Sequence, residues 1–95
     1  MPAFLIADVE VTDPAGYDEY KKGVSVTIAA YQGRYLARGG ATVVLEGDWL
    51  PSRAVIIEFP SVDRLKAWYA SPEYAPLKRI RERTAKSRML IIEGL

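Results

Sequence analysis

The nine residues AFLIADVEV, 3–11, constrain the fold more than any other stretch because their side chains alternate in character. A period of two is typical of a β-strand, in which successive side chains point to opposite faces. One face carries Phe4, Ile6, Asp8 and Glu10, and the other carries Leu5, Ala7, Val9 and Val11. Because the second face is wholly apolar, other elements of the fold must cover this strand on that side.

A helix is expected directly after this strand. Asp13 followed by Pro14 is typical of an N-cap residue and a first helical residue, and Gly33 suits the position just past the helix end. Apolar and aromatic residues recur between them every three or four positions: Tyr17, Tyr20, Val24, Ile28 and Tyr31. This stripe predicts a helix lying on a sheet, and packing must stabilise its β-branched segment VSVTI, which disfavours a helix locally.

Further strands and helices follow in the second half of the chain. Residues 34–46 and 53–59 are predicted to be strands joined by the loop GDWLPS, and Pro60 ends the second of them. Ser61 is expected to cap a short helix, and a second helical start follows at Ser71, with Pro72 as its first residue. The segment SRMLIIEG, 87–94, predicts the last strand.

The order β-α-β-β-α-β predicts an α+β, ferredoxin-like fold. In this βαββαβ plan both helices lie on one face of a four-stranded antiparallel sheet, here in a single domain of residues 1–95. Three of the four strands are apolar on both faces, so a second copy is expected to cover the face without helices. The predicted assembly is a homodimer joined sheet to sheet, a dimeric α+β barrel.

The charge and the missing residue types exclude several kinds of function. The chain carries 13 Lys and Arg against 12 Asp and Glu, and this balance gives no field that would attract nucleic acid or an anionic membrane. It contains no Cys and no His, which excludes a thiolate nucleophile, a Ser-His-Asp triad, a Cys/His zinc site and histidine-ligated haem. We therefore expect no metal site and no cofactor, in a protein of the cytoplasm.

Three segments, RGG…LEGDW, VIIEFPS and WYASPEY, together resemble the bacterial family "domain of unknown function 1330". The resemblance runs from the first strand to the terminal IIEGL. It implies a fold and a dimer of the α+β barrel kind, whose relatives include cofactor-free monooxygenases, muconolactone-type isomerases and haem-binding proteins. It implies no particular reaction, because the family has none assigned.

Charged residues inside apolar strands form the first candidate site. Asp8, Arg38 and Glu58 lie in the first, second and third predicted strands, which are neighbours in this fold. Their side chains could converge on one sheet face, where an arginine between two carboxylates could bind an anionic substrate. The alternative is a structural ion-pair network at the dimer interface.

The junction between the last two predicted helices is the second candidate site. Trp68, Tyr69 and Ser71 surround free backbone N–H groups there, and Tyr74 could donate a proton to a bound carboxylate or enolate. Alternatively, Ser71 is only a cap and the aromatic side chains are core. Arg81 shares the inward face with Tyr74 and could clamp an anion at the pocket mouth, or extend along the helix to water.

These residues lead to hypotheses of different classes. The first is a cofactor-independent isomerase or monooxygenase acting on a small aromatic or polyketide-like acid, with Glu58 and Tyr74 as base and acid and Arg38 or Arg81 as the anion anchor. The ligand would be bound by Asp8, Arg38, Trp68, Tyr69 and Ser71. The second is a non-catalytic ligand-binding or structural dimer, and the third, a haem or flavin binder, is disfavoured by the missing histidine and glycine-rich loop. The first requires a cavity above about 150 Å³ near Ser71 and Arg81, since ligand pockets usually reach roughly 300 Å³.

Two glycines interrupt the second predicted strand directly after Arg38. Gly39 and Gly40 predict a bulge or bend that turns Arg38 toward the carboxylates, and a Gly-Gly turn splitting the run into two short strands is the alternative. Trp49 stands in the predicted hairpin loop, where a large aromatic residue suggests a contact with a partner chain.

Overall fold

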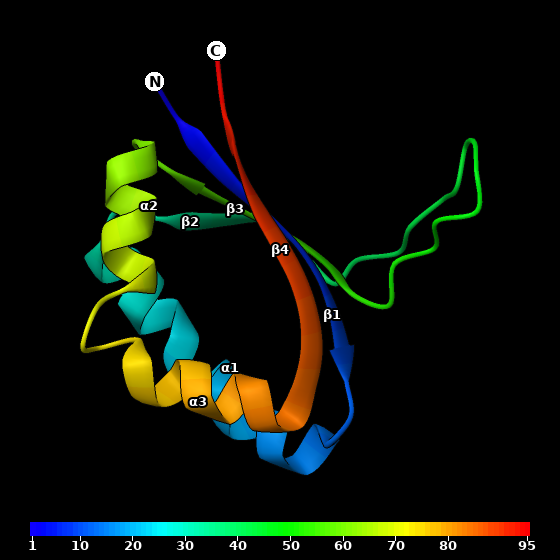
Figure 1. Ribbon diagram of the computed structural model, residues 1–95, viewed down its shortest axis with the longest axis horizontal. Helices are drawn as coiled ribbons and strands as arrows, with labels where there is room; N and C mark the ends of the chain where they lie inside the picture. The colour runs from blue at the N-terminus through cyan, green and yellow to red at the C-terminus, as the bar shows by residue number, and fades with distance from the viewer.

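The computed structural model describes residues 1–95 and contains four strands and three helices (Figure 1). In chain order these are β1 (Ala3–Val11), α1 (Pro14–Ala30), β2 (Arg34–Arg38), β3 (Ala54–Phe59), α2 (Val62–Tyr69), α3 (Ala75–Thr84) and β4 (Ala85–Glu93). The strands form one antiparallel sheet in the order β2-β3-β1-β4. This is the predicted ferredoxin-like arrangement, with its second helical segment divided into α2 and α3.

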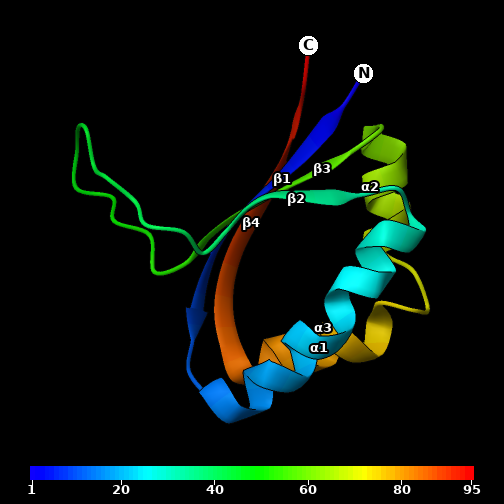
Figure 2. The same ribbon diagram turned by 180° about the vertical axis from the view of Figure 1, so that it is seen from behind.

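All three helices lie on the same side of the sheet, as the two opposite views agree (Figures 1 and 2). We call the side that they cover the inner face and the other side the outer face. Ala3, Leu5, Ala7 and Val9 are buried at 5% exposure or less, whereas the residues between them are only half-buried. The alternation in β1 therefore separates the two faces as the sequence predicts.

Helix α1 begins as predicted and ends for a different reason. The Gly16 N–H donates to the Asp13 carboxylate at 3.2 Å, so Asp13 is the N-cap. At the other end the left-handed residue is Gln32, at φ 62°, rather than Gly33. Gly33 is needed because of close packing, since a Cβ there would lie 2.6 Å from the ring of Phe59.

Ser71 caps a turn rather than the first residues of the last helix. Its hydroxyl donates to the Trp68 carbonyl at 2.7 Å and accepts from the Tyr74 N–H at 3.1 Å. The predicted helix start at Pro72 is wrong, because residues 72–74 form a turn and α3 begins at Ala75. The last strand, by contrast, is confirmed, but it starts two residues before the predicted segment and ends one residue before its end, at Glu93.

The predicted strand 34–46 is far shorter than expected. β2 ends at Arg38, and residues 39–53 form an extended arm that projects from the sheet on the side away from the helices (Figures 1 and 2). Val43 and Leu45 in this arm are 84% and 91% exposed. The β-branched residues there have no neighbouring strand within the chain, so a high strand propensity alone does not produce a strand.

The irregularity predicted at Gly39 and Gly40 exists, but in a different form. The ladder between β2 and β3 has a register shift between Tyr35 and Ala37, so the bulge lies before the glycines. Gly39 ends the strand with φ 70°, and the alternative of two short strands is wrong because the arm contains none. No helix of the structure is both long enough and apolar enough to cross a membrane.

Candidate functional site

A cavity of about 320 Å³ lies between the inner face of the sheet and the helices. Its floor is made of apolar side chains from β1 and β3, including Leu5, Val9 and Ile57. Val24, Trp68 and Met89 add further apolar surface, and the remaining lining residues are three phenols and four cations: Tyr17, Tyr20, Tyr35, Lys21, Arg38, Arg53 and Arg81. The cavity exceeds the volume that the enzyme hypothesis required, and Arg81 lines it as expected.

No Asp or Glu side chain is among the residues that line this cavity. Lys21 forms an exposed ion pair with Asp18 at 3.6 Å on the same helix. The other two salt bridges of the molecule involve Arg34 and Arg88, so the three arginines of the cavity form none. Because opposite charges attract most strongly where water is excluded, the cavity favours a ligand with negative charge.

Arg81 is the most buried of these cations, at 6% exposure. Its Nε–H donates to the Tyr74 hydroxyl at 3.2 Å, and the Tyr74 and Tyr20 hydroxyls share a hydrogen bond of 2.8 Å. Burial acts to lower the pKa of Arg81, but the neighbouring phenols of Tyr74 and Tyr20 act in the opposite direction and prevail. The guanidinium therefore stays charged inside the protein.

The phenols lining the cavity stay protonated at neutral pH. Burial raises the pKa of Tyr17, although Arg53 and Arg81 oppose the shift, and burial raises that of Tyr20 strongly. Burial likewise raises the pKa of Tyr35 against the effect of Arg38. Each phenol can therefore donate a hydrogen bond to an oxygen atom of a bound molecule.

The bulge in β2 decides where Arg38 points. Arg34 lies opposite Glu58 and its Nε–H donates to that carboxylate at 2.7 Å on the outer face. The extra residue of the bulge reverses the alternation, so that Arg38 lies opposite Val55 on the inner face. There its guanidinium stacks on the Tyr35 ring at 4.5 Å and lines the cavity.

The predicted convergence of Asp8, Arg38 and Glu58 is therefore wrong. Asp8 and Glu58 lie on the outer face, where Arg88 and Arg34 pair with them at 3.3 and 2.7 Å. The bulge turns Arg38 away from both carboxylates rather than toward them. The cavity consequently contains no carboxylate that could act as a general base, which removes Glu58 from the predicted pair of acid and base.

The helix junction contributes only part of what the sequence predicts. Trp68 lines the cavity at 1% exposure, and its indole N–H donates to Thr27 at 3.0 Å. Tyr74 is fully buried and contacts the cavity residues through its hydroxyl. Ser71 holds the turn described above. Tyr69 lies at the surface, where the Lys78 ammonium stands 4.3 Å from the centre of its ring. Neither residue lines the cavity.

Five polar lining residues were not among the predicted site residues: Tyr17, Tyr20, Lys21, Tyr35 and Arg53. The sequence does contain a signal for Arg53, because it alternates with Val55 and Ile57 and so belongs to the inner face. The two tyrosines of α1 fall on the apolar stripe, which predicts core positions for them. A phenol on such a stripe is also an available hydrogen-bond donor wherever the packing leaves space.

The fold and this cavity define a small ferredoxin-like protein with a cationic and phenolic site between its sheet and its helices. A family model for the domain of unknown function DUF1330 matches residues 2–95. The chain therefore belongs to the DUF1330 family, as its three motifs predict. No curated protein matches the sequence.

Solved structures share the fold at low sequence identity. A protein of unknown function from Rhodopseudomonas palustris is 19% identical with a TM-score of 0.79, covering 99% of this chain and 82% of the other. A dimeric ferredoxin-like protein of unknown function from Bacteroides fragilis is 16% identical with a TM-score of 0.64, covering 98% and 96%. SnoaB, a cofactor-independent oxygenase from Streptomyces nogalater, is 14% identical with a TM-score of 0.58, covering 99% and 93%. At these identities the likeness establishes the fold.

Proposed function

We propose that this protein binds a small aromatic or polyketide-like acid, as its anion, in the cavity between sheet and helices. One observation carries the proposal: every charged side chain that lines the cavity is a cation, and the other polar groups there include three phenols. The apolar floor and Trp68 suit an aromatic ring system. The cations supply the counter-charge that a carboxylate or enolate requires.

Arg81 is the central anion-binding residue in this proposal. It is buried without a carboxylate partner, and an anionic ligand would supply one. Because Tyr74 accepts a hydrogen bond from Arg81, its own proton can be donated to Tyr20, and the Tyr20 O–H is then free for a ligand oxygen. This chain of donors would stabilise negative charge on the bound molecule.

Binding is the core of the proposal, and catalysis is its extension. A cavity that stabilises an enolate is also suited to a cofactor-independent isomerase or monooxygenase, and SnoaB is an oxygenase of this kind with a similar fold. However, the lining residues include no carboxylate that could abstract a proton. This observation favours the alternative, a non-catalytic ligand-binding dimer. Catalysis would require a substrate that is acidic enough to lose its proton without a carboxylate base.

We also propose that the functional unit is a homodimer formed through the outer face. Leu36, Leu90 and Ile92 are 48%, 57% and 55% exposed, and the arm adds the exposed side chains of Trp49 and Leu50. An apolar surface of this extent is normally covered in solution. A second copy of the same sheet is complementary to it, and the Bacteroides protein with this fold is dimeric.

The Arg81→Gln variant tests the binding proposal. Calorimetric titration with salicylate and related aromatic and polyketide-like acids should give binding to the wild-type protein, and about ten- to a hundredfold weaker binding to the variant, as loss of a charged hydrogen bond predicts. Arg79→Gln, an exposed position on the same helix, is the matched control and should bind like the wild type. If none of the acids binds, or if Arg81→Gln binds them equally well, the proposal is wrong.

A further inference from the structure

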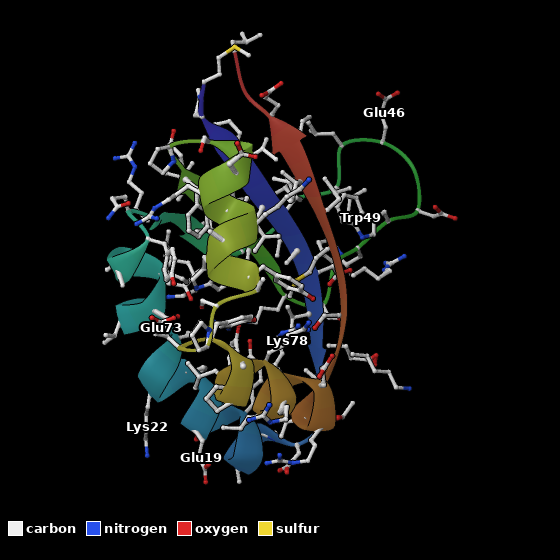
Figure 3. All side chains as sticks on the ribbon, turned by 60° about the vertical axis from the view of Figure 1, so that its left-hand side comes forward. Glu19, Lys22, Glu46, Trp49, Glu73 and Lys78 are labelled. Carbon is white, nitrogen blue, oxygen red and sulfur yellow. The ribbon has the colours of Figure 1, made fainter.

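The end of the arm nearest β3 is held by a single carboxylate. Asp8 accepts hydrogen bonds from the Ser52 N–H at 2.9 Å, the Arg53 N–H at 3.4 Å and the Trp49 indole N–H at 3.3 Å. The Arg88 guanidinium adds an ion pair at 3.3 Å. Figure 3 shows Trp49 on the arm, whose outer end carries Glu46. Asp8 therefore joins the arm to the outer face of β1.

The backbone of Arg53 is held at this attachment, but its side chain lies on the opposite face of the sheet. Its carbonyl accepts from the Val9 N–H at 2.9 Å, so Arg53 lies opposite Val9. The Val9 side chain faces the cavity, and the side chain of Arg53 accordingly lines the cavity as well. Its Nε is buried and has no hydrogen-bond partner. A buried donor without a partner is costly, and the guanidinium that carries it forms no salt bridge.

Gly39 leaves the space that the Arg53 guanidinium occupies. A Cβ at position 39 would lie 2.6 Å from Arg53 Nη1, and the φ of 70° at this residue is one that only glycine adopts readily. The Gly39 N–H donates to the Ala54 carbonyl at 2.8 Å, so the first residue of the arm is hydrogen-bonded to the residue that follows its last. Both ends of the arm therefore fix where Arg53 lies.

We propose that Arg53 is a second anion-binding residue of the cavity and that Asp8, on the opposite face of the sheet, is the positioning residue that keeps it there. This inference rests on the proposed binding of an acid in the cavity. Asp8 holds the backbone of Arg53, and Gly39 leaves room for its guanidinium. The same attachment also fixes Trp49, so the arm links the ligand site to the surface where a second copy would bind.

A double-mutant cycle with salicylate as the probe tests the positioning role. In calorimetric titrations, Asp8→Asn and Arg53→Gln should each weaken salicylate binding by about tenfold, the loss expected for one charge-assisted hydrogen bond. The double variant should bind no more weakly than Arg53→Gln, because Asp8 acts through Arg53. The neutral analogue salicylamide should bind all four proteins alike. Glu10→Gln, an exposed carboxylate on the same face of β1, is the control and should leave salicylate binding unchanged.

Limited digestion with trypsin provides a readout that needs no ligand. Trypsin cleaves after Lys and Arg, and between Arg38 and Arg53 the sequence contains neither. Cleavage of the Arg53–Ala54 bond, followed by mass spectrometry, should be several-fold faster in Asp8→Asn than in the wild type and in Glu10→Gln.

The outcomes separate the two proposals. Unchanged cleavage after Arg53 in Asp8→Asn overturns the positioning role, and so does a double variant whose fold-loss of salicylate affinity equals the product of the two single fold-losses. If salicylate and the other acids fail to bind the wild-type protein, the binding proposal fails, and the digestion still decides whether Asp8 holds Arg53.

Discussion

Inside this protein the charged side chain of Arg81 is surrounded by hydroxyl groups rather than by carboxylates. The Tyr74 hydroxyl accepts a hydrogen bond from the Arg81 Nε–H at 3.2 Å, and the Tyr74 and Tyr20 hydroxyls share a hydrogen bond of 2.8 Å. A carboxylate in the same place would neutralise the arginine and leave it little attraction for a ligand. Pairing the cation with phenols keeps it hydrogen-bonded and still available to an anion.

The buried phenols make the stability of the fold sensitive to alkaline pH. Because burial raises the pKa of Tyr20 and Tyr17, the folded chain holds these protons more tightly than the unfolded chain does. These phenols therefore leave the free energy of unfolding unchanged below about pH 10, the ordinary pKa of tyrosine, and lower it as the pH rises above that value. Urea unfolding at a series of pH values should show this fall, and Tyr20→Phe should make it shallower.

Tyr31→Phe is the matched control for that measurement. Tyr31 is the C-cap residue of the same helix and is only half-buried, and its hydroxyl is bonded to the exposed Glu73 at 3.1 Å. The variant should retain the alkaline fall of the wild type. A fall that is equally steep in Tyr20→Phe would mean that other groups cause it.

At the scale of elements, the bulge in β2 is the feature that builds the site. Without the extra residue, Arg34 and Arg38 would share the outer face, because they are four positions apart in a strand of period two. The register shift sends Arg38 to the cavity and leaves Arg34 with Glu58. One additional residue in one strand thus assigns two arginines to different roles.

The two adjacent glycines should respond oppositely to substitution by alanine. Gly39→Ala forces a left-handed backbone on a residue with a Cβ and places that atom 2.6 Å from Arg53, so we expect about 1–2 kcal/mol lower stability. At Gly40 a Cβ would meet nothing within 4 Å, and the backbone there is not left-handed, so Gly40→Ala should be neutral or slightly stabilising.

Urea unfolding and salicylate titration of both variants test this difference. Gly39→Ala should also weaken salicylate binding, since Arg53 must move. Equal stability of the two variants would show that the conformation at position 39 is not required.

The order of the elements and the faces of β1 could be predicted from the sequence, because alternation and helix caps are local signals. The end of β2 could not be predicted, because a strand needs a neighbour and TVVL has none within this chain. The bulge could not be predicted from the sequence either, because its residues Tyr35 and Leu36 suit a regular strand. Arg38 was therefore assigned to the wrong face, whereas Arg81, placed by the regular period of a helix, was correctly assigned to the inner side.

At the scale of the whole molecule, the two faces of one sheet have opposite chemistry. The inner face carries the cations and phenols of the cavity, and the outer face carries a half-exposed apolar surface with Asp8 and Glu58 paired at its margins. The net charge of +1 gives no indication that the two faces differ in charge. Ligand binding and self-association can therefore be tested by substitutions that do not overlap.

The Leu90→Glu variant tests the homodimer. Leu90 lies on the outer face opposite Ile6, and a carboxylate there would be buried without a partner in a sheet-to-sheet dimer. Sedimentation equilibrium should give a dimer for the wild type and a dissociation constant raised by about tenfold or more for the variant. Val26→Glu is the control, since Val26 is 73% exposed on α1, on the helix side of the molecule. A monomeric wild type, or a Leu90→Glu dimer of unchanged strength, would contradict the proposal.

The positions of the two tryptophans give this chain a separate optical signal for each of its faces. Trp68 forms part of the cavity wall at 1% exposure, and Trp49 sits on the arm at 58% exposure. Indole fluorescence shifts to shorter wavelengths and changes in intensity as water is excluded, so the buried ring reports on the cavity and the exposed ring on the arm. In Trp49→Phe the emission comes from the ligand site alone, and in Trp68→Phe it comes from the surface where a second copy would bind. Filling of the cavity and pairing of chains can therefore be followed in the same solution without any attached dye.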